Sequence, residues 1–243
     1  RKQIPALVAS GYRVIVPDQR GYNLSDKPPG IKAYRLHELV NDVVGLIDAL
    51  DYQKVNLVGH DWGALVAWAM GIWQPARLHR MGILNVPHPA VITRFLTRDL
   101  EQLRRSWYVF AFQLPWLPER LLTADNCHRA ERILRGSGKT HTFTREDIEK
   151  YKQAWSQPGA MSAMINWYRA ALRYPPSISK NLRVTVPTLM LWGMKDVALT
   201  HRMARPSMDY CDDGRLVLFA DATHWVQLDE AEEVTKHLLE FFK

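Results

Sequence analysis

Three polar residues, each predicted to lie at the end of a buried strand, could carry out nucleophilic chemistry. Asp61 lies in the segment VNLVGHDWGA, residues 55–64, at the tip of a turn between Gly59 and Gly63. The spacing is that of a G-x-S-x-G turn, with aspartate in place of the serine. Such a turn brings a strand and the following helix close together and presents its central residue at the tip. An aspartate there is ionised at neutral pH, because its unperturbed pKa is about 3.9, and can attack without a base.

Asp196 and His224 supply the other two members of a possible triad. Asp196 ends the segment LWGMKD and His224 lies in THW, each just beyond an apolar run. The chain order nucleophile, acid, histidine is one in which catalytic triads occur on parallel sheets, where strand ends converge at one edge. Taken singly, Asp61 could cap a helix, Asp196 could be a turn residue and His224 a helix cap.

The elements that must position these residues follow from apolar runs. Continuous apolar runs, typical of parallel strands covered on both faces, predict five strands: Arg13–Val16, Lys54–Val58, Met81–Val86, Thr188–Trp192 and Leu216–Phe219. Between the first two, LHELVNDVVGLIDAL (36–50) has helical spacing of its apolar residues. Alternating strand and helix predicts an α/β fold with a mostly parallel sheet flanked by helices.

The middle of the chain has a different pattern. From about residue 90 to 176 no run predicts a strand, and tryptophans and prolines are frequent. We interpret it as an inserted helical cap, which divides the chain into core residues 1–89, cap residues 90–176 and core residues 177–243. The closing DEAEEVTKHLLEFF predicts an amphipathic helix with acidic residues in its first turn, where they favour the helix dipole.

Composition excludes several classes of protein. The net charge of +7 is spread along the chain without a dense Lys/Arg block, so nucleic-acid binding is not expected. No apolar run reaches the roughly 18 residues of a membrane span. Cys127 and Cys211 do not make a disulfide framework, which favours a reducing compartment such as the cytoplasm. A targeting segment upstream of Arg1 would not be visible in this sequence.

No cofactor or metal is expected. The histidines lack metal-ligand spacing with acids or cysteines, and no P-loop or dinucleotide glycine pattern is present. A monomer and a homodimer are both compatible with the sequence.

The whole chain resembles the carboxyl-terminal four-fifths of an α/β-hydrolase-fold epoxide hydrolase. The matching segments are PDQRGYNLSDKP (17–28), GHDWGA (59–64), WYVFAFQLPWLPE (107–119), SQPGAMSAMINWYR (156–169), LWGMKD (191–196) and THW (223–225). The two tyrosine segments are the sharpest signal, since haloalkane dehalogenases share an aspartate followed by tryptophan.

The resemblance implies hydrolysis of an epoxide to a vicinal diol, with the epoxide and water as the only partners. Asp61 would form an ester with the epoxide, and His224, oriented by Asp196, would activate the water that cleaves it. In the family a pair of cap tyrosines polarises the epoxide oxygen, and the matching positions are Tyr108 and Tyr168. The alternative is that both tyrosines are aromatic core residues of the cap.

Further residues are expected to shape the site. Trp62 could offer its backbone N–H to an oxyanion and its ring to the pocket wall. Four cap residues are candidates for the substrate pocket, namely Phe110, Phe112, Trp116 and Met164. His60, which precedes the candidate nucleophile, is interpreted as a structural hydrogen-bonding residue.

The sequence departs from the family at one place. Family members carry an H-G-x-P segment after the third strand, which supplies half of the oxyanion hole, and this chain has none. Its absence would leave a gap in the middle of the sheet with unpaired backbone groups, which folded proteins avoid. Either the chain is a fragment, which we favour, or another segment fills the gap.

Two other functions remain open at this stage. A haloalkane or haloacid dehalogenase would use the same Asp61, with indole N–H groups of Trp62 and Trp107 holding the halide. A non-catalytic ligand-binding protein of the same fold is supported by the missing oxyanion segment and opposed by the complete triad.

Overall fold

The computed structural model describes residues 1–175 and 182–243. The chain divides into two compact units, which are described separately. The first contains Arg1–Ile15, Val43–Arg105 and Ile178–Lys243, and the second contains Val16–Asp42 and Ser106–Ser177. One division falls within helix α2 (Leu36–Ala49). The boundary expected between core and cap at residues 89 and 90 stays a prediction. The second expected boundary, between residues 176 and 177, lies outside the described residues.

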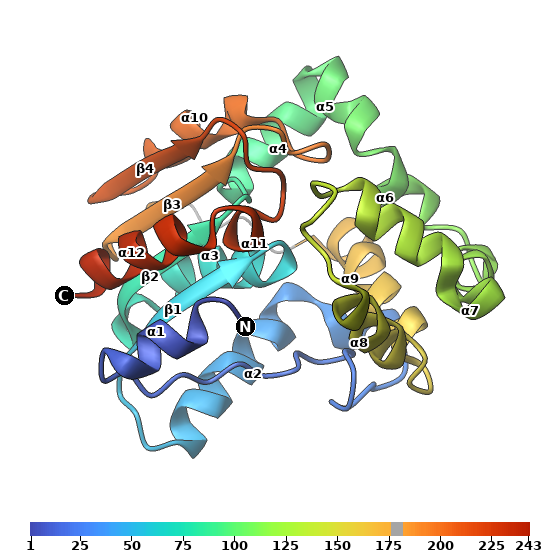
Figure 1. Cartoon of the computed structure of the whole chain (residues 1–243), viewed down its shortest axis with the longest axis horizontal. Coiled ribbons are helices and arrows are strands. Elements are labelled where there is room, and N and C mark those ends of the chain that lie inside the picture. The colour runs from blue at the N-terminus through green and yellow to red at the C-terminus, as the bar shows by residue number, and fades with distance from the viewer. Residues whose placement is uncertain (176–181) are drawn as a thin grey trace. The chain divides into compact units, whose positions relative to one another are not determined.

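The first unit is built on a parallel sheet of β1 (Val55–His60), β2 (Leu78–Leu84), β3 (Thr188–Gly193) and β4 (Gly214–Phe219), in that spatial order (Figure 1). His60 pairs with Leu84 at one end of the sheet, and Gly193 pairs with Phe219. Four of the five predicted strands are therefore confirmed, with bounds shifted by a few residues. Because the strands are parallel, the loops that follow them lie at one edge of the sheet.

The prediction of a strand at Arg13–Val16 is wrong. These residues form no strand, and Val16 is 71% exposed. An apolar run becomes a strand only where a neighbouring strand accepts its hydrogen bonds. Among the described residues β1 pairs with β2 alone, so no described segment fills the place beside β1 where the sequence led us to expect a gap.

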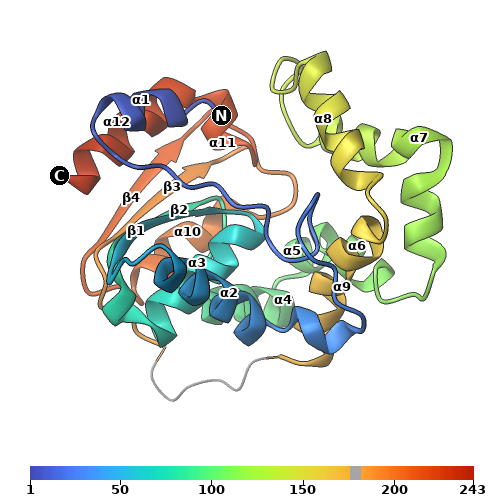
Figure 2. The ribbon, with the colours of Figure 1, turned by 90° about the horizontal axis from the view of Figure 1, so that it is seen from below.

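Helices cover both faces of this sheet. Figure 2 shows α1 (Ile4–Ala9) and α12 (Ala231–Phe242) on one face, with α3 (Trp62–Trp73) and α10 (Ala204–Met208) on the other. Helix α3 is apolar on nearly every side and largely buried, as expected for a helix packed against a sheet. Under α12 lies an apolar cluster formed by Leu84, Leu189, Leu191, Ala222, Val226, Val234, Leu238, Phe241 and Phe242.

Shorter helices complete the first unit. They are the 3-10 helices η2 (Pro75–Arg77) and η3 (His201–Met203) and the α-helices α4 (Pro89–Arg98), α5 (Leu100–Arg105) and α11 (Val226–Asp229). The predicted carboxyl-terminal helix is confirmed as α12, with Glu232 and Glu233 in its first turn.

The described residues of the second unit form helices and connecting loops, with no strand among them. It contains the 3-10 helix η1 (Ile31–Tyr34) and the helices α6 (Trp107–Ala111), α7 (Leu117–Gly136), α8 (Arg145–Trp155) and α9 (Ala160–Arg173). Helix α9 buries Trp167, whose indole N–H donates to the carbonyl of Arg20. A Cβ at Gly21 would lie 2.9 Å from both Ala163 and Tyr34, so the segment 16–42 packs closely on α9.

Candidate active site

The turn between β1 and α3 holds Asp61 in an unusual backbone conformation. Asp61 has φ 51° and ψ −128°, in a region that residues with side chains rarely adopt. The turn is so tight that a Cβ on Gly59 would lie 2.6 Å from the Cα of Ala64. Glycine at position 59 therefore permits the turn, and the turn presents the carboxylate of Asp61 with its side chain 41% exposed.

Asp196 lies in the loop after β3 and is almost fully buried. Its Oδ1 accepts hydrogen bonds from the backbone N–H groups of Ala198 and Leu199, at 2.8 and 2.9 Å. Its Oδ2 accepts from the Nδ2 of Asn85 at 2.9 Å and lies 2.7 Å from the Nδ1 of His224. Burial raises the pKa of Asp196, but the charge of His224 and these donors outweigh it and hold the pKa below its usual value.

His224 lies in the loop after β4 and faces two carboxylates. Its Nδ1–H donates to Asp196, which orients the other ring nitrogen, Nε2, toward the candidate nucleophile. The Nε2 of His224 lies 3.4 Å from Oδ1 of Asp61. The structure thus brings together the three residues that the sequence predicted as a triad, in the mutual contacts that nucleophile, base and orienting acid require.

The charge of this imidazole depends on both neighbours. Burial lowers the pKa of His224, but the charge and hydrogen bond of Asp196, together with the carboxylate of Asp61, raise it to about 10. The pKa of Asp61 is lowered in turn: burial raises it, while the hydrogen bond and charge of His224 lower it further, with help from the N–H of Trp62. In the resting protein a protonated His224 therefore lies between two ionised carboxylates.

His60 supports the loop that carries His224. Its Nε2–H donates to the carbonyl oxygen of His224 at 2.8 Å, and the two rings lie 4.6 Å apart. Burial and the charge of His224 lower the pKa of His60 to about 4, so His60 is neutral near pH 7. This is the contact of a structural hydrogen-bonding residue.

Asn85 is a site residue that the sequence analysis missed. It follows β2, is fully buried and has φ 52°. Its amide oxygen accepts from the N–H of Gly193 at 2.8 Å, while its Nδ2 donates to the Gly193 carbonyl and to Asp196. Its signal was its position, since it lies just beyond a buried strand as Asp196 and His224 do.

Gln102 and Arg105 of α5 hold the same loop and were also missed. The side-chain amide of Gln102 donates to the carbonyl of Ala198 and accepts from the N–H of Thr200. Arg105 donates to the carbonyl of Asp196 at 2.8 Å. Their partners lie more than 90 positions away in the chain, so nothing in the local sequence marks these residues.

The candidate tyrosines lie together in the second unit. Tyr108 of α6 and Tyr168 of α9 have ring centroids 5.9 Å apart, with their planes at 76°. Phe112 makes edge contacts with both rings, at 5.9 and 4.9 Å. The other pocket candidates are less enclosed, with Phe110 50% and Trp116 65% exposed and Met164 half-buried.

No group of His, Cys, Asp and Glu residues within 1–175 and 182–243 is arranged to hold a metal ion. In the same residues no helix has the length and apolarity to cross a bilayer.

Comparison with known proteins gives the family. The profile described as "alpha/beta hydrolase fold" matches residues 1–231. The chain belongs to the α/β-hydrolase family. It is 41% identical over its whole length to the "AB hydrolase superfamily protein YfhM" of Bacillus subtilis, of which it covers 85%. This agrees with the α/β fold that alternating strands and helices predicted and with the α/β-hydrolase fold that the resemblance implied.

Several relatives of this α/β hydrolase are named as epoxide hydrolases. It is 37% identical to human "Epoxide hydrolase 4" over 96% of its own length, and it spans 66% of that protein. The crystal structure of a Bacillus megaterium epoxide hydrolase in complex with an inhibitor superposes with a TM-score of 0.85 at 26% identity, over 92% of this chain and 81% of that one.

The close approach at Gly59 gives a first prediction for this α/β hydrolase. We expect Gly59→Ala to lower the free energy of unfolding by at least about 1–3 kcal/mol, because the added methyl group would overlap backbone atoms that cannot move independently. Gly45→Ala is the matched control, since nothing lies within 4 Å of a Cβ there. Urea unfolding measures both. Equal stability of the two variants would contradict the packing described for the turn.

The charge of His224 gives a second prediction. Its pKa is raised in the folded chain from 6.5 to about 10, so the stability from its proton is complete below pH 6.5 and is lost as the pH rises through about 10. We expect the free energy of unfolding to fall more steeply across this range in the wild type than in His224→Gln. Cys211, with a pKa raised to about 11, contributes equally to both proteins. Parallel pH profiles would be inconsistent with a protonated His224.

Proposed function

We propose that this α/β hydrolase converts epoxides to vicinal diols through a covalent ester on Asp61. The observation that carries the proposal is the carboxylate of Asp61 at the tip of the turn, 3.4 Å from an imidazole that Asp196 orients. The names of its relatives, among them human epoxide hydrolase 4 and epoxide hydrolase A of Mycobacterium tuberculosis, support the same activity.

The first step opens the ring. A carboxylate oxygen of Asp61 attacks an epoxide carbon, a carbon–oxygen bond of the ring breaks, and the ring oxygen leaves as an alkoxide. The lowered pKa of Asp61 keeps it ionised for this attack. In the proposal Tyr108 and Tyr168 donate hydrogen bonds to the ring oxygen, and one of them transfers its proton to it. A phenol suits this role because its pKa of about 10 keeps the proton available at pH 7.

The second step hydrolyses the ester. Once Asp61 is esterified it has no charge, so one of the two carboxylates that raise the pKa of His224 is lost. The imidazolium then gives up its proton, which returns through solvent to the tyrosinate left by ring opening. His224 then takes a proton from water, and the hydroxide formed adds to the ester carbonyl carbon. The N–H of Trp62, which already interacts with the Asp61 carboxylate, donates to the oxyanion. Collapse of this intermediate expels the alkoxide, which takes the proton of the carboxylic acid formed on Asp61. The diol leaves, and Asp61 is again a carboxylate beside a protonated His224.

The proposal extends to the partners of the reaction, the substrate pocket, the cap and the location of the protein. The reaction needs only the epoxide and water, and none of its steps uses a cofactor or a metal. The pocket roles of Phe110, Phe112, Trp116 and Met164, the assignment of residues 90–176 as the cap and a cytoplasmic location stay predictions.

The ester intermediate gives a third prediction. With His224→Gln and styrene oxide, attack by Asp61 proceeds while hydrolysis stalls, so the intact protein gains the mass of the substrate. Peptide mapping after digestion locates the adduct on the peptide that contains Asp61. Asp61→Asn serves as the control and stays unmodified.

The alternatives predict different results. Wild type that turns over 1-chlorobutane and not styrene oxide would make the protein a dehalogenase. Tight binding of either compound without turnover, and with no adduct in His224→Gln, would favour a binding protein.

The tyrosine pair gives a fourth prediction. Losing one preorganised donor to a developing oxyanion typically costs about 10²–10³ in rate, roughly 3–4 kcal/mol. We therefore expect Tyr108→Phe and Tyr168→Phe each to slow ester formation by this order. Activity stays measurable, because the other phenol still donates to the alkoxide. The double variant should be nearly inactive, with non-additive effects because both groups act on one charge.

The rate of ester formation is measured before the steady state, by quenching of tryptophan fluorescence with styrene oxide. The melting temperature controls for folding, since phenylalanine keeps the ring. Ester hydrolysis should change little. Wild-type rates of ester formation in both single variants would show that the tyrosines are only packing residues.

A further inference from the structure

Two arginines of α9 bind the loop that follows α6. Three consecutive carbonyl oxygens in this loop, those of residues 112–114, each accept a hydrogen bond from α9. Arg169 donates from Nε to Phe112 at 2.9 Å and from Nη2 to Leu114, while Arg173 donates to Gln113 at 2.8 Å. Two side chains of α9 therefore hold three successive carbonyl groups of this loop. All of these residues belong to the second unit.

Arg169 is the buried member of this pair. It is 7% exposed, and its guanidinium also makes a bidentate ion pair with Glu119, in the first turn of α7. A planar fork with five donors matches a carboxylate and two carbonyls at once, which the point charge of a lysine cannot do. Removing either partner of a buried ion pair leaves an uncompensated charge, which is strongly destabilising. The contact between Arg169 and Glu119 is therefore expected to stay formed in the folded protein.

Phe112 and Gln113, which Arg169 and Arg173 bind, also contact the two tyrosines. Tyr168 precedes Arg169 on α9, and Tyr108 lies one helical turn before Phe112. The ring of Phe112 contacts both phenol rings, and the side chain of Gln113 donates to the carbonyl of Tyr168 at 3.2 Å. The contacts between α9 and the loop after α6 therefore include residues that touch both phenol rings.

We propose that Arg169 is a positioning residue that sets the spacing of Tyr108 and Tyr168 for ring opening. This inference rests on the proposed function. Two donors serve one oxygen only if both lie about 2.7–3.1 Å from it. A displacement of 1 Å at such a site can cost on the order of 10² in rate. Since the tyrosines act on the ring oxygen and not on the ester, the effect of Arg169 is confined to ester formation.

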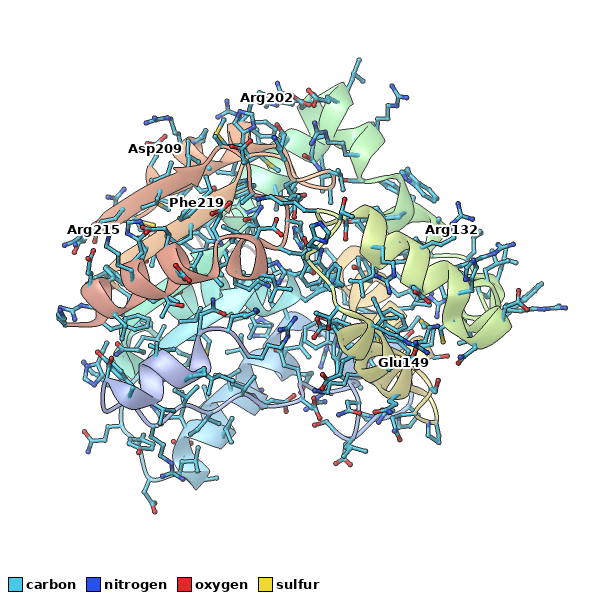
Figure 3. All side chains as sticks on the ribbon, viewed as in Figure 1. Arg132, Glu149, Arg202, Asp209, Arg215 and Phe219 are labelled. Carbon is cyan, nitrogen blue, oxygen red and sulfur yellow. The ribbon has the colours of Figure 1, made fainter. Side chains whose placement is uncertain are left out.

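The test compares the two chemical steps in Arg169→Lys, which keeps the positive charge and loses the planar fork. With styrene oxide we expect ester formation to slow by about 10–100-fold and ester hydrolysis to stay within about twofold of wild type. Arg132→Lys is the control, because Arg132 lies exposed on α7 of the same unit (Figure 3). Circular dichroism and the melting temperature check folding.

A double-variant cycle separates positioning from general damage. If Arg169 acts through the tyrosines, Arg169→Lys costs less in a Tyr168→Phe background than in wild type, because one of the two donors it positions is already absent. Full additivity, or equal slowing of both chemical steps, would overturn the proposal. So would a folded Arg169→Lys that forms the ester at the wild-type rate.

A second variant covers the case in which Arg169→Lys does not fold. Glu119→Gln weakens the ion pair and keeps the carbonyl contacts of Arg169, and we expect a smaller slowing that is again confined to ester formation. Failure of this inference can be distinguished from failure of the proposed function. If the proposed function fails, Tyr108→Phe and Tyr168→Phe form the ester at the wild-type rate. If this inference alone fails, both tyrosine variants remain slow.

Discussion

The site depends on one buried interaction, the hydrogen bond between the Nδ1 of His224 and the carboxylate of Asp196. This bond fixes the ring so that Nε2 faces Asp61. The charge and the hydrogen bond of Asp196 are also the largest of the influences that raise the pKa of His224 and keep its imidazole protonated at rest. A carboxylate this deeply buried is costly unless its oxygens are satisfied. Asp196 accepts from two backbone N–H groups, from Asn85 and from His224, so the cost is met by donors that also hold it still.

The donors around Asp196 also join the loops into one body. Asn85, after β2, binds both backbone groups of Gly193, at the end of β3. A Cβ on Gly193 would lie 2.6 Å from the carbonyl of Ala222, in the loop after β4, so these loops are in close backbone contact. Helix α5 adds the bidentate contact of Gln102. The triad is therefore positioned by the sheet edge as a whole rather than by three independent loops.

Sequence reasoning recovered the parts of this arrangement that have a local signature. Buried parallel strands have continuous apolar runs, and Asp61, Asp196 and His224 each follow one, so their convergence at one edge could be predicted. The run at Arg13–Val16 has the same local signature but no partner strand, and the error shows that pairing is not a property of a segment. Gln102 and Arg169 were not found, because their roles are defined by distant partners. Asn85 was missed because the predicted strand Met81–Val86 included it, whereas β2 ends at Leu84.

The turn at Asp61 has a consequence for how the chemistry of this fold can change. Its geometry is imposed by the backbone approach at Gly59 and by the helix that follows, and the side chain at the tip makes no capping hydrogen bond to that helix. The turn can therefore present a different side chain at position 61 without a change in the backbone around it. A single substitution that replaces the carboxylate by a hydroxyl or a thiol would keep the backbone of the turn and change the reaction class. It would also remove one of the two carboxylates that raise the pKa of His224, so that the imidazole becomes a stronger candidate base for the new nucleophile.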